Sequence, residues 1–151
     1  MSMYRNILVP TDGSKLAGKG IREGVKVAKA VGASVTGVYV AAPWAPPINT
    51  EGSTYSAQSF SPREYRKLTE RASKKALAAV ERAARDARVR CRTRLVTDNQ
   101  PWRGILRAAR AARCDAIAMG SHGRGAVGGL ILGSETSRVL AHSKLPVLVV
   151  R

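Results

Sequence analysis

A glycine-rich segment near the C-terminus has the composition of an anion-binding loop. Residues 119–140, MGSHGRGAVGGLILGSETSRVL, follow a strand-like run and lead into a segment with helical spacing. At such a junction the first N–H groups of the helix have no partner within the helix, and the helix dipole favours negative charge. Glycines let phosphate oxygens approach the backbone closely. The segment therefore predicts a site for a phosphate-bearing ligand.

Two familiar phosphate-loop patterns fit this segment only in part. Residues 123–128, GRGAVG, match the dinucleotide-binding pattern, but that pattern also needs an acidic residue about 20 positions later to hold the ribose. The next predicted strand ends the chain at Val150-Arg151 with no acid. Residues 128–133 have the glycine spacing of a P-loop, but Ser134-Glu135 stands where that motif requires Lys-Ser/Thr. Both assignments are therefore rejected.

A third spacing fits completely. Gly120-x-x-Gly123, nine residues and then Gly133-Ser134 form the signature G-2x-G-9x-G-(S/T). With this signature the chain resembles the universal stress protein family, in its UspA-like, ATP-binding branch. The resemblance covers nearly the whole length, including residues 7–14 (ILVPTDGS), 36–40 (TGVYV) and 137–150.

The resemblance implies a site for ATP, with AMP or ADP as alternatives, and for Mg²⁺ held through the phosphates rather than by the protein alone. The implied phosphate cradle consists of Gly120, Ser121, His122, Gly123, Gly133 and Ser134. Asp12 would face the ribose, and the backbone around Val40 would meet the adenine edge. Pro10, Thr11 and Met119 would complete the pocket, and Thr136 would lie near the phosphates or the metal.

Three polar residues of this set have alternative explanations. Glu135 stands where relatives carry a small or apolar residue, and its carboxylate would repel a triphosphate unless it points to solvent at the helix N-terminus or helps to hold Mg²⁺. Asp12 could instead cap the following helix, since Asp-Gly-Ser is favourable turn chemistry. His122 has no evident Asp or Ser partner, which favours contact with the loop or phosphates over general-base catalysis.

Five short apolar runs predict the strands that position this loop: Asn6–Val9, Ser34–Val40, Cys91–Val96, Ala116–Met119 and Pro146–Val150. Helical spacing predicts helices over Ser14–Val31, from Ser61 onward, from Pro101 onward and from about Gly133 to His142. The alternation predicts one α/β domain over residues 1–151, an open five-stranded parallel sheet with helices on both faces. The resemblance implies the strand order 3-2-1-4-5. Ligands of such sheets bind beyond the carboxyl ends of the strands.

The same patterns predict burial. Leu16 and Leu68 are expected to face the core from the first two helices, and Cys91 and Cys114 to be small buried hydrophobic residues. Residues 91–96 alternate in polarity, which suits an edge strand with one wet face. Residues 42–60 have no period and predict a long excursion from the fold.

The formal net charge of +16 is unevenly distributed, because residues 63–94 hold twelve Lys/Arg against four acids. Such charge attracts polyanions of any kind. Arg103, Arg107 and Arg110 share one helical face, which is either solvated or available to a polyanion. No apolar run approaches the ~20 residues of a membrane span, and no signal sequence is evident, so a cytoplasmic location is expected.

Together these features predict an ATP-binding stress-response protein that acts as a nucleotide-dependent sensor or switch. It is not expected to be an enzyme beyond a very slow ATPase, because the P-loop lysine is absent. The alternative is a basic polyanion- or nucleic-acid-binding protein with a secondary nucleotide site. The apolar terminal strand Pro146–Val150 further predicts a homodimer.

Overall fold

Strands and helices alternate along the chain, as predicted. The computed structural model describes residues 2–46, 60–121 and 132–151. Its elements are β1 (Asn6–Pro10), α1 (Lys15–Val31), β2 (Ser34–Ala41), α2 (Pro62–Ala87), β3 (Cys91–Thr97), α3 (Pro101–Ala111), β4 (Ala116–Gly120), α4 (Ser134–His142) and β5 (Val147–Val150). The predicted strands and helices are therefore confirmed, with ends that differ by a residue or so.

The strands form one parallel sheet in the order β3-β2-β1-β4-β5. In the register of the central strand, Ile7 pairs with Val35 of β2 on one side and with Ala116 of β4 on the other. The predicted α/β class and strand order are confirmed. Strands β2 and β4 flank β1 on opposite sides, so the order in which strands are added to the sheet reverses between β1 and β4. Folds of this kind bind ligands at that point.

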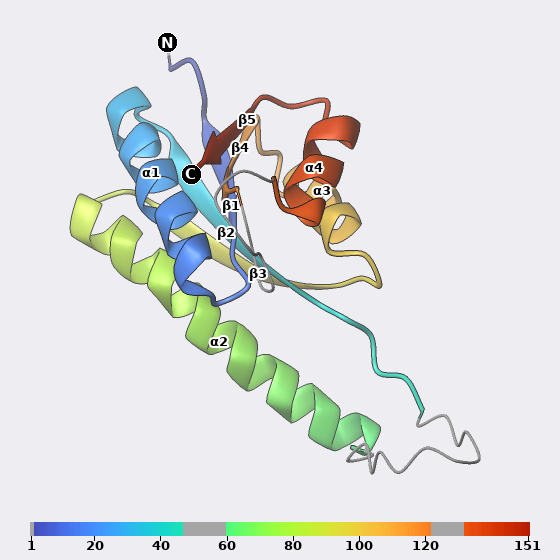
Figure 1. Cartoon of the computed structure of the whole chain (residues 1–151). Coiled ribbons are helices and arrows are strands. Elements are labelled where there is room, and N and C mark those ends of the chain that lie inside the picture. The colour runs from blue at the N-terminus through green and yellow to red at the C-terminus, as the bar shows by residue number, and fades with distance from the viewer. Residues whose placement is uncertain (1, 47–59, 122–131) are drawn as a thin grey trace.

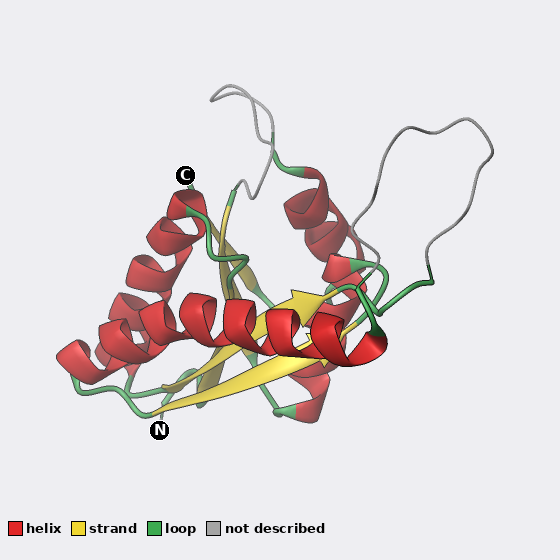
Figure 2. Cartoon of the chain, turned by 90° about the horizontal axis from the view of Figure 1, so that it is seen from below, coloured by secondary structure: helices red, strands yellow, loops and turns green. Residues whose placement is uncertain are grey.

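Helices cover both faces of this sheet, α1 and α2 one face and α3 and α4 the other (Figures 1 and 2). Successive strand residues point to opposite faces, so each strand contributes to two cores. Ile7 and Val9 pack with Ile21 of α1 and Val80 of α2. On the other face Leu8 packs against α3 and α4 in a cluster with Val38, Ile105, Ile117 and Val139. Aliphatic side chains thus fix all four helices to the sheet.

Helix α2 begins beyond the sheet. It opens with a capping box, in which Ser61 Oγ accepts a hydrogen bond from Glu64 N (3.2 Å) and Glu64 Oε2 accepts one from Ser61 N (2.8 Å). Its buried residues start only at Ser73, and Figure 1 shows its N-terminal half extending past the ends of the strands. Within this half, Tyr65 Oη donates to the carbonyl oxygen of Ala42 (2.6 Å), which joins the helix to the chain leaving β2.

Two leucines that were predicted to face the core are exposed, so both predictions were wrong. Leu68 is 43 % exposed because its turn of α2 lies beyond the sheet, and Leu16 is 40 % exposed in the first turn of α1. Periodicity identifies the face of a helix that is apolar, but it does not show where the surface that should cover this face ends.

The edge strand β3 also differs from expectation. It is an edge strand on which Arg92 and Arg94 are exposed, as predicted, but the opposite face is not fully covered, because Leu95 is 41 % exposed. Cys114 is buried as predicted, whereas Cys91 at the start of β3 is only partly buried. An edge strand is covered by helices less completely than a central strand, so neither face of β3 is fully enclosed. Among the described helices, none has the length and apolarity needed to cross a membrane.

Candidate functional site

The carboxyl ends of the two central strands lie side by side. Leu8 of β1 pairs with Ile117 of β4, so Pro10 and Gly120, the last residues of these strands, reach the same edge of the sheet. The strand ends that carry Pro10 and Met119, two residues of the implied pocket, are therefore neighbours in space. Met119, predicted to line the pocket, is 7 % exposed within β4.

The two ends of the glycine signature are in direct contact. The backbone N–H of Gly133 donates to the carbonyl oxygen of Ser121 (2.7 Å), and the N–H of Ser121 donates to the carbonyl of Val150 in β5 (2.7 Å). The buried hydroxyl of Thr136 donates to the carbonyl of Gly120 (3.0 Å). Residues far apart in the signature thus meet where β4 ends and α4 begins. The predicted contacts of His122 and Gly123 lie outside the described residues.

Helix α1 supports this junction through a glycine. A Cβ atom at Gly20 would lie 2.5 Å from the nitrogen of Gly120 and 2.8 Å from the carbonyl carbon of Met119. Only glycine fits there without movement of the neighbouring backbone, since real Cβ atoms do not come this close to backbone atoms. The sequence did not predict this contact between Gly20 and the end of β4.

The N-terminus of α4 lacks the side-chain N-cap that α1 and α2 have. Ser14 Oγ accepts a hydrogen bond from Ala17 N in α1 (3.2 Å), and Ser61 does the same for α2. At the start of α3, Glu135 of α4 accepts a backbone N–H group, as described below. Among the described residues no side chain caps α4, whose N-cap residue is Gly133. Its first N–H groups are the kind of donors that bind anions.

The backbone of Gly133 does not itself require glycine. Its φ of −58° and ψ of 148° are open to any residue. What glycine provides at this position is the absence of a side chain beside the α4 N-terminus, where Ser134 is exposed. A residue without a side chain lets a ligand approach the backbone closely.

The turn after β1 is held by its own side chains. Thr11 is buried, its N–H donates to the carbonyl of Val38 (2.9 Å), and its Oγ1 accepts from Gly13 N (3.1 Å). Asp12 Oδ1 accepts from Ser14 N (2.9 Å), and Gly13 has a positive φ of 82°. Asp12 therefore holds the turn, but the helix cap of its alternative explanation is Ser14, and the contact of Asp12 with a ribose stays a prediction.

The end of β2 is positioned by α3. Val40, predicted to lie at the adenine edge, is half-buried, and a Cβ on Gly104 of α3 would lie 2.6 Å from its Cγ1. This close approach keeps the start of α3 against the carboxyl end of β2. A larger side chain at position 104 would push Val40 or α3 away.

Asp98 anchors the same region and is a residue that the sequence analysis did not single out. Its side chain is 1 % exposed and accepts hydrogen bonds from Arg103 Nε (3.0 Å), Gln100 N (2.9 Å) and Arg107 Nη1 (2.7 Å). These bonds, Arg103 first and Gln100 second, lower the pKa of Asp98 to about 2. One feature of the sequence could have indicated this residue. Asp98 lies three residues before Pro101, and a proline after such a residue is typical of a helix start.

Glu135 connects α4 to α3. Its Oε2 accepts the backbone N–H of Trp102 in the first turn of α3 (2.7 Å), and its Oε1 pairs with Arg138 Nη1 (3.2 Å). Neither sequence alternative, an acid facing solvent or one holding Mg²⁺, included this contact. Trp102 also stacks on His142 of α4, with ring centroids 4.3 Å apart. Glu135 thus provides α3 with the acidic group that favours a helix N-terminus.

Comparison with known proteins agrees with this geometry. The model of the universal stress protein family matches residues 3–151. The chain belongs to the universal stress protein family. One relative, the universal stress protein in the QAH/OAS sulfhydrylase 3′ region of Thermus aquaticus, is 34 % identical over 149 residues, 99 % of this chain and 100 % of that protein.

Two other proteins extend the comparison of this universal stress protein. Universal stress protein MJ0531 of Methanocaldococcus jannaschii is 28 % identical over 99 % of this chain and 84 % of its own length. The solved structure of the hypothetical protein MJ0577 has a TM-score of 0.73 at 30 % identity, covering 98 % of this chain and 96 % of that one. The five-stranded fold is therefore that of the family.

Proposed function

We propose that this universal stress protein binds ATP at the carboxyl edge of β1 and β4 and acts as a nucleotide-dependent sensor or switch in the stress response. The observation that carries the proposal is the N-terminus of α4. The N–H of Gly133, the N-cap residue, donates to the carbonyl oxygen of Ser121 (2.7 Å), which places the helix start beside the end of β4, and no described side chain caps the helix. A phosphate group would supply the negative charge and the acceptors that this helix end favours.

The residues around this point fit a nucleotide. Phosphates would lie against the N–H groups that follow Gly133 at the start of α4, because the N–H of Gly133 itself donates to Ser121. The adenosine would extend across β1 toward Val40 of β2, past Asp12. Mg²⁺ would arrive with the phosphates, since no group of three His, Cys, Asp or Glu side chains among the described residues could hold a metal ion. Because Thr136 Oγ1 donates to Gly120, its part in the site is to position the loop.

Two structural neighbours support the class of ligand. A universal stress protein crystallised with cAMP matches this chain with a TM-score of 0.69 at 20 % identity. Another, from Archaeoglobus fulgidus, was crystallised with dAMP and matches with a TM-score of 0.59 at 18 % identity. At these identities they indicate what the fold can hold, namely adenine nucleotides. The preference for ATP rests on the complete glycine signature of this chain.

Calorimetric titration with ATP tests the proposal on a Gly133→Val variant. The φ of Gly133 suits valine, so the variant should fold, while its branched side chain should block the approach of a phosphate. We expect at least a tenfold loss of affinity, which is about 1.4 kcal/mol. Gly18→Val is the matched control, because a Cβ at Gly18 meets only the tip of Arg22 at 3.4 Å. Equal ATP affinity in both folded variants would reject the phosphate-loop assignment.

A further inference from the structure

The outer side of α2 carries a continuous row of cations. Eight Lys/Arg and four Asp/Glu occur between Pro62 and Ala87. Five of the cations recur at steps of three, four and eight residues, which places them along one side of the helix. We name this row the α2 stripe; it consists of Lys67, Arg71, Lys74, Arg82 and Arg85, with Ala78 at the one vacant step. At ~1.5 Å per residue it is about 27 Å long.

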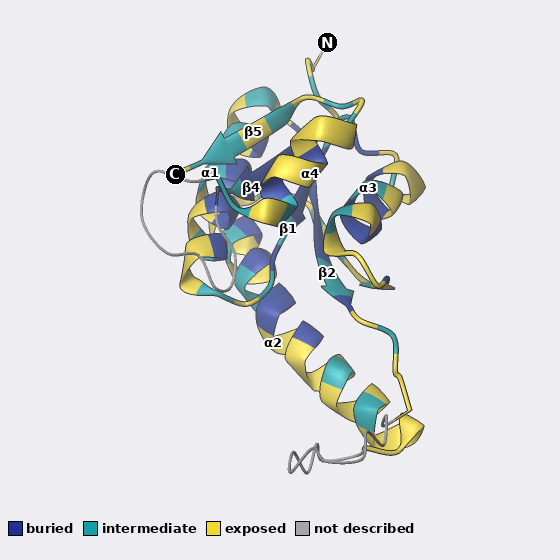
Figure 3. Ribbon diagram, turned by 45° about the vertical axis from the view of Figure 1, so that its right-hand side comes forward, coloured by how far each residue is buried: buried dark blue, intermediate teal, exposed yellow. Residues whose placement is uncertain are grey.

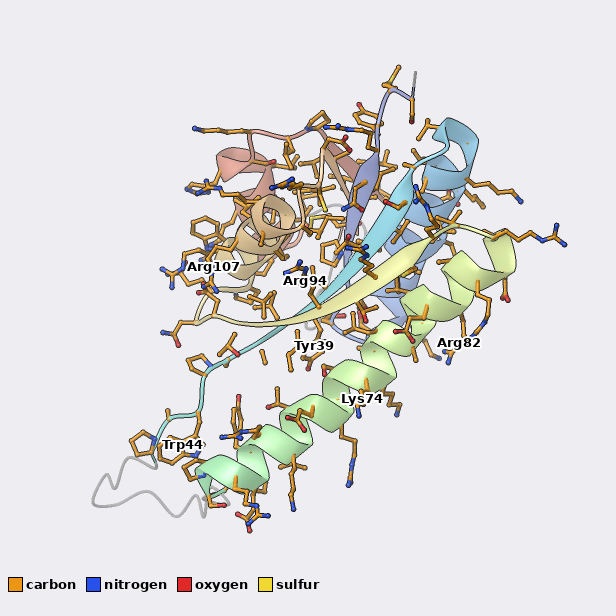
Figure 4. All side chains as sticks on the ribbon, turned by 180° about the vertical axis from the view of Figure 1, so that it is seen from behind. Tyr39, Trp44, Lys74, Arg82, Arg94 and Arg107 are labelled. Atoms are coloured by element: carbon orange, nitrogen blue, oxygen red, sulfur yellow. The ribbon has the colours of Figure 1, made fainter. Side chains whose placement is uncertain are left out.

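The side chains of the α2 stripe are exposed and without acidic partners. All five residues are exposed, and Figure 3 shows the outer side of α2 as mostly exposed surface. Figure 4 shows Lys74 and Arg82 extending from α2 away from the sheet. In the described part of the chain, none of the ion pairs includes a cation of α2.

Two of the four acids of α2 are directed elsewhere, and the other two, Glu70 and Asp86, form no ion pair among the described residues. Glu64 accepts a hydrogen bond from Ser61 N in the capping box, and Glu81 accepts one from Thr93 Oγ1 of β3 (3.2 Å). The α3 cations differ from the α2 stripe, because Arg103 and Arg107 both pair with Asp98. Of the two basic faces that the sequence suggested, the one on α2 therefore keeps its charge available.

The composition of the α2 stripe selects among anionic partners. A helix that binds a membrane surface presents an apolar face to the lipid, but the apolar face of α2 packs on the sheet through Ala76, Leu77 and Val80. Single-stranded nucleic acid is bound through aromatic side chains on which bases stack, and no aromatic residue lies between Lys67 and Arg85. A straight row of cations without either feature matches the phosphates of a duplex, which are contacted without reading the bases.

We propose that the α2 stripe binds the phosphate backbone of duplex nucleic acid without sequence specificity. This site is separate from the candidate nucleotide site, because the stripe lies on the outside of α2 and the nucleotide site lies where α4 and β4 meet. Binding of a duplex therefore does not depend on the nucleotide site, and the two activities can be lost independently.

Fluorescence anisotropy with a labelled 24-base-pair DNA duplex of arbitrary sequence tests this. The stripe variant is Arg71→Ala, Lys74→Ala and Arg82→Ala, all at exposed helical positions that alanine suits. The control variant removes the same number of charges from the exposed side of α1, by Lys19→Ala, Arg22→Ala and Lys29→Ala. Both variants therefore have the same net charge, and only the α2 stripe differs.

Five phosphate contacts predict that the affinity for the duplex falls about 500-fold between 50 and 200 mM salt. The reason is that the logarithm of the binding constant falls with the logarithm of the salt concentration with a slope of about −0.9 per contact. The stripe variant should fall only about tenfold over the same range, and the control variant should follow the native protein. The same slopes are expected for a duplex RNA and for a DNA of unrelated sequence. The Gly133→Val variant should bind the duplex as the native protein does. Loss of the nucleotide site can therefore be distinguished from loss of the α2 stripe.

Several results would overturn the proposal. If both triple variants lose affinity and salt dependence equally, net charge alone accounts for binding. No binding of the duplex at 50 mM salt, or a stripe variant that binds like the native protein, would exclude the site. Loss of binding to anionic phosphatidylglycerol vesicles in the stripe variant, with unchanged duplex binding, would assign the stripe to membranes instead.

Discussion

A Cβ atom on Gly20 of α1 would lie 2.5 Å from the backbone nitrogen of Gly120 at the end of β4. The helix on one face of the sheet therefore touches the strand end from which the glycine signature starts. Nearby, Gly24 keeps the same helix close to Ala118 and Val9, because a Cβ atom on Gly24 would lie 3.0 Å from a side-chain carbon of each. The position of the candidate phosphate site thus depends on small residues in α1 as well as on the loop itself.

Gly20→Ala should destabilise the protein by about 1–3 kcal/mol, because the neighbouring atoms are backbone and cannot rotate away. The backbone around Gly120 should shift, and ATP affinity should fall with it. Urea unfolding measures the first effect and calorimetry the second. Gly18→Ala on the same helix is the control and should stabilise by about 0.5–1 kcal/mol, since alanine is the better helix former there. Equal stabilities of the two variants would contradict the close contact.

Glu135→Ala should cost about 0.5–2 kcal/mol, as does the loss of other N-terminal helix caps, because the N–H of Trp102 loses its acceptor. Glu135→Gln should recover part of this, since its amide oxygen can still accept. If Glu135 serves α3 in this way, the Mg²⁺ dependence of ATP binding should be the same in Glu135→Gln and the native protein. A changed Mg²⁺ dependence would show that the carboxylate also acts on the metal.

Asp98 predicts a pH dependence of stability. Arg103 and the N–H of Gln100 lower the pKa of Asp98 from its ordinary 3.8 to about 2 in the folded protein. A lowered folded pKa stabilises the folded state above the unfolded value, and this stabilisation is lost as pH falls from about 4 to 2. The difference in unfolding free energy between the native protein and Asp98→Asn should therefore shrink over this interval. A difference that is the same at pH 6 and pH 2 would contradict the assignment.

The strand positions were predictable because each is a short apolar run bounded by polar residues, and β1 and β4 are buried on both faces. Helix faces were predictable only where a partner surface exists. Leu68 belongs to the apolar face of α2 by spacing, yet the sheet ends before it. The length over which a helix contacts the sheet depends on the assembled fold. The spacing of apolar residues in one helix does not reveal it.

The candidate site was predictable in its glycines and less so in its acids. The signature placed Gly120 and Gly133 together, and the structure brings them to one junction. Glu135 accepts the N–H of Trp102 in α3, a helix separated from it by more than 20 residues in the chain, and two arginines of the same helix hold Asp98. An acidic residue shows that a cation or an N–H group will be near, but not which one, because long-range packing decides this.

The edge strand β5 predicts a homodimer. Leu148 in β5 is 42 % exposed, and β5 ends the sheet order, so a second copy can pair with it. Light scattering at high micromolar concentration should report a dimer, and Leu148→Lys should shift it toward monomer. Leu95→Lys is the matched control, since Leu95 is 41 % exposed on the opposite edge strand β3. A monomeric native protein would reject the dimer.

ATP should be bound without rapid turnover. Hydrolysis needs a positioned water, a metal in register and charge stabilisation that increases in the transition state. The N–H groups at the start of α4 would bind phosphate in the ground state and the transition state about equally, which lowers the dissociation constant without raising kcat. The carboxylates near the site already have partners, because Asp98 holds arginines, Glu135 accepts the N–H of Trp102, and Asp12 accepts the N–H of Ser14. Phosphate release from saturating Mg-ATP should be slower than about one turnover per minute, against ~10 s⁻¹ for a typical enzyme. Turnover near that enzymatic rate, abolished by Gly133→Val, would replace the sensor with an ATPase.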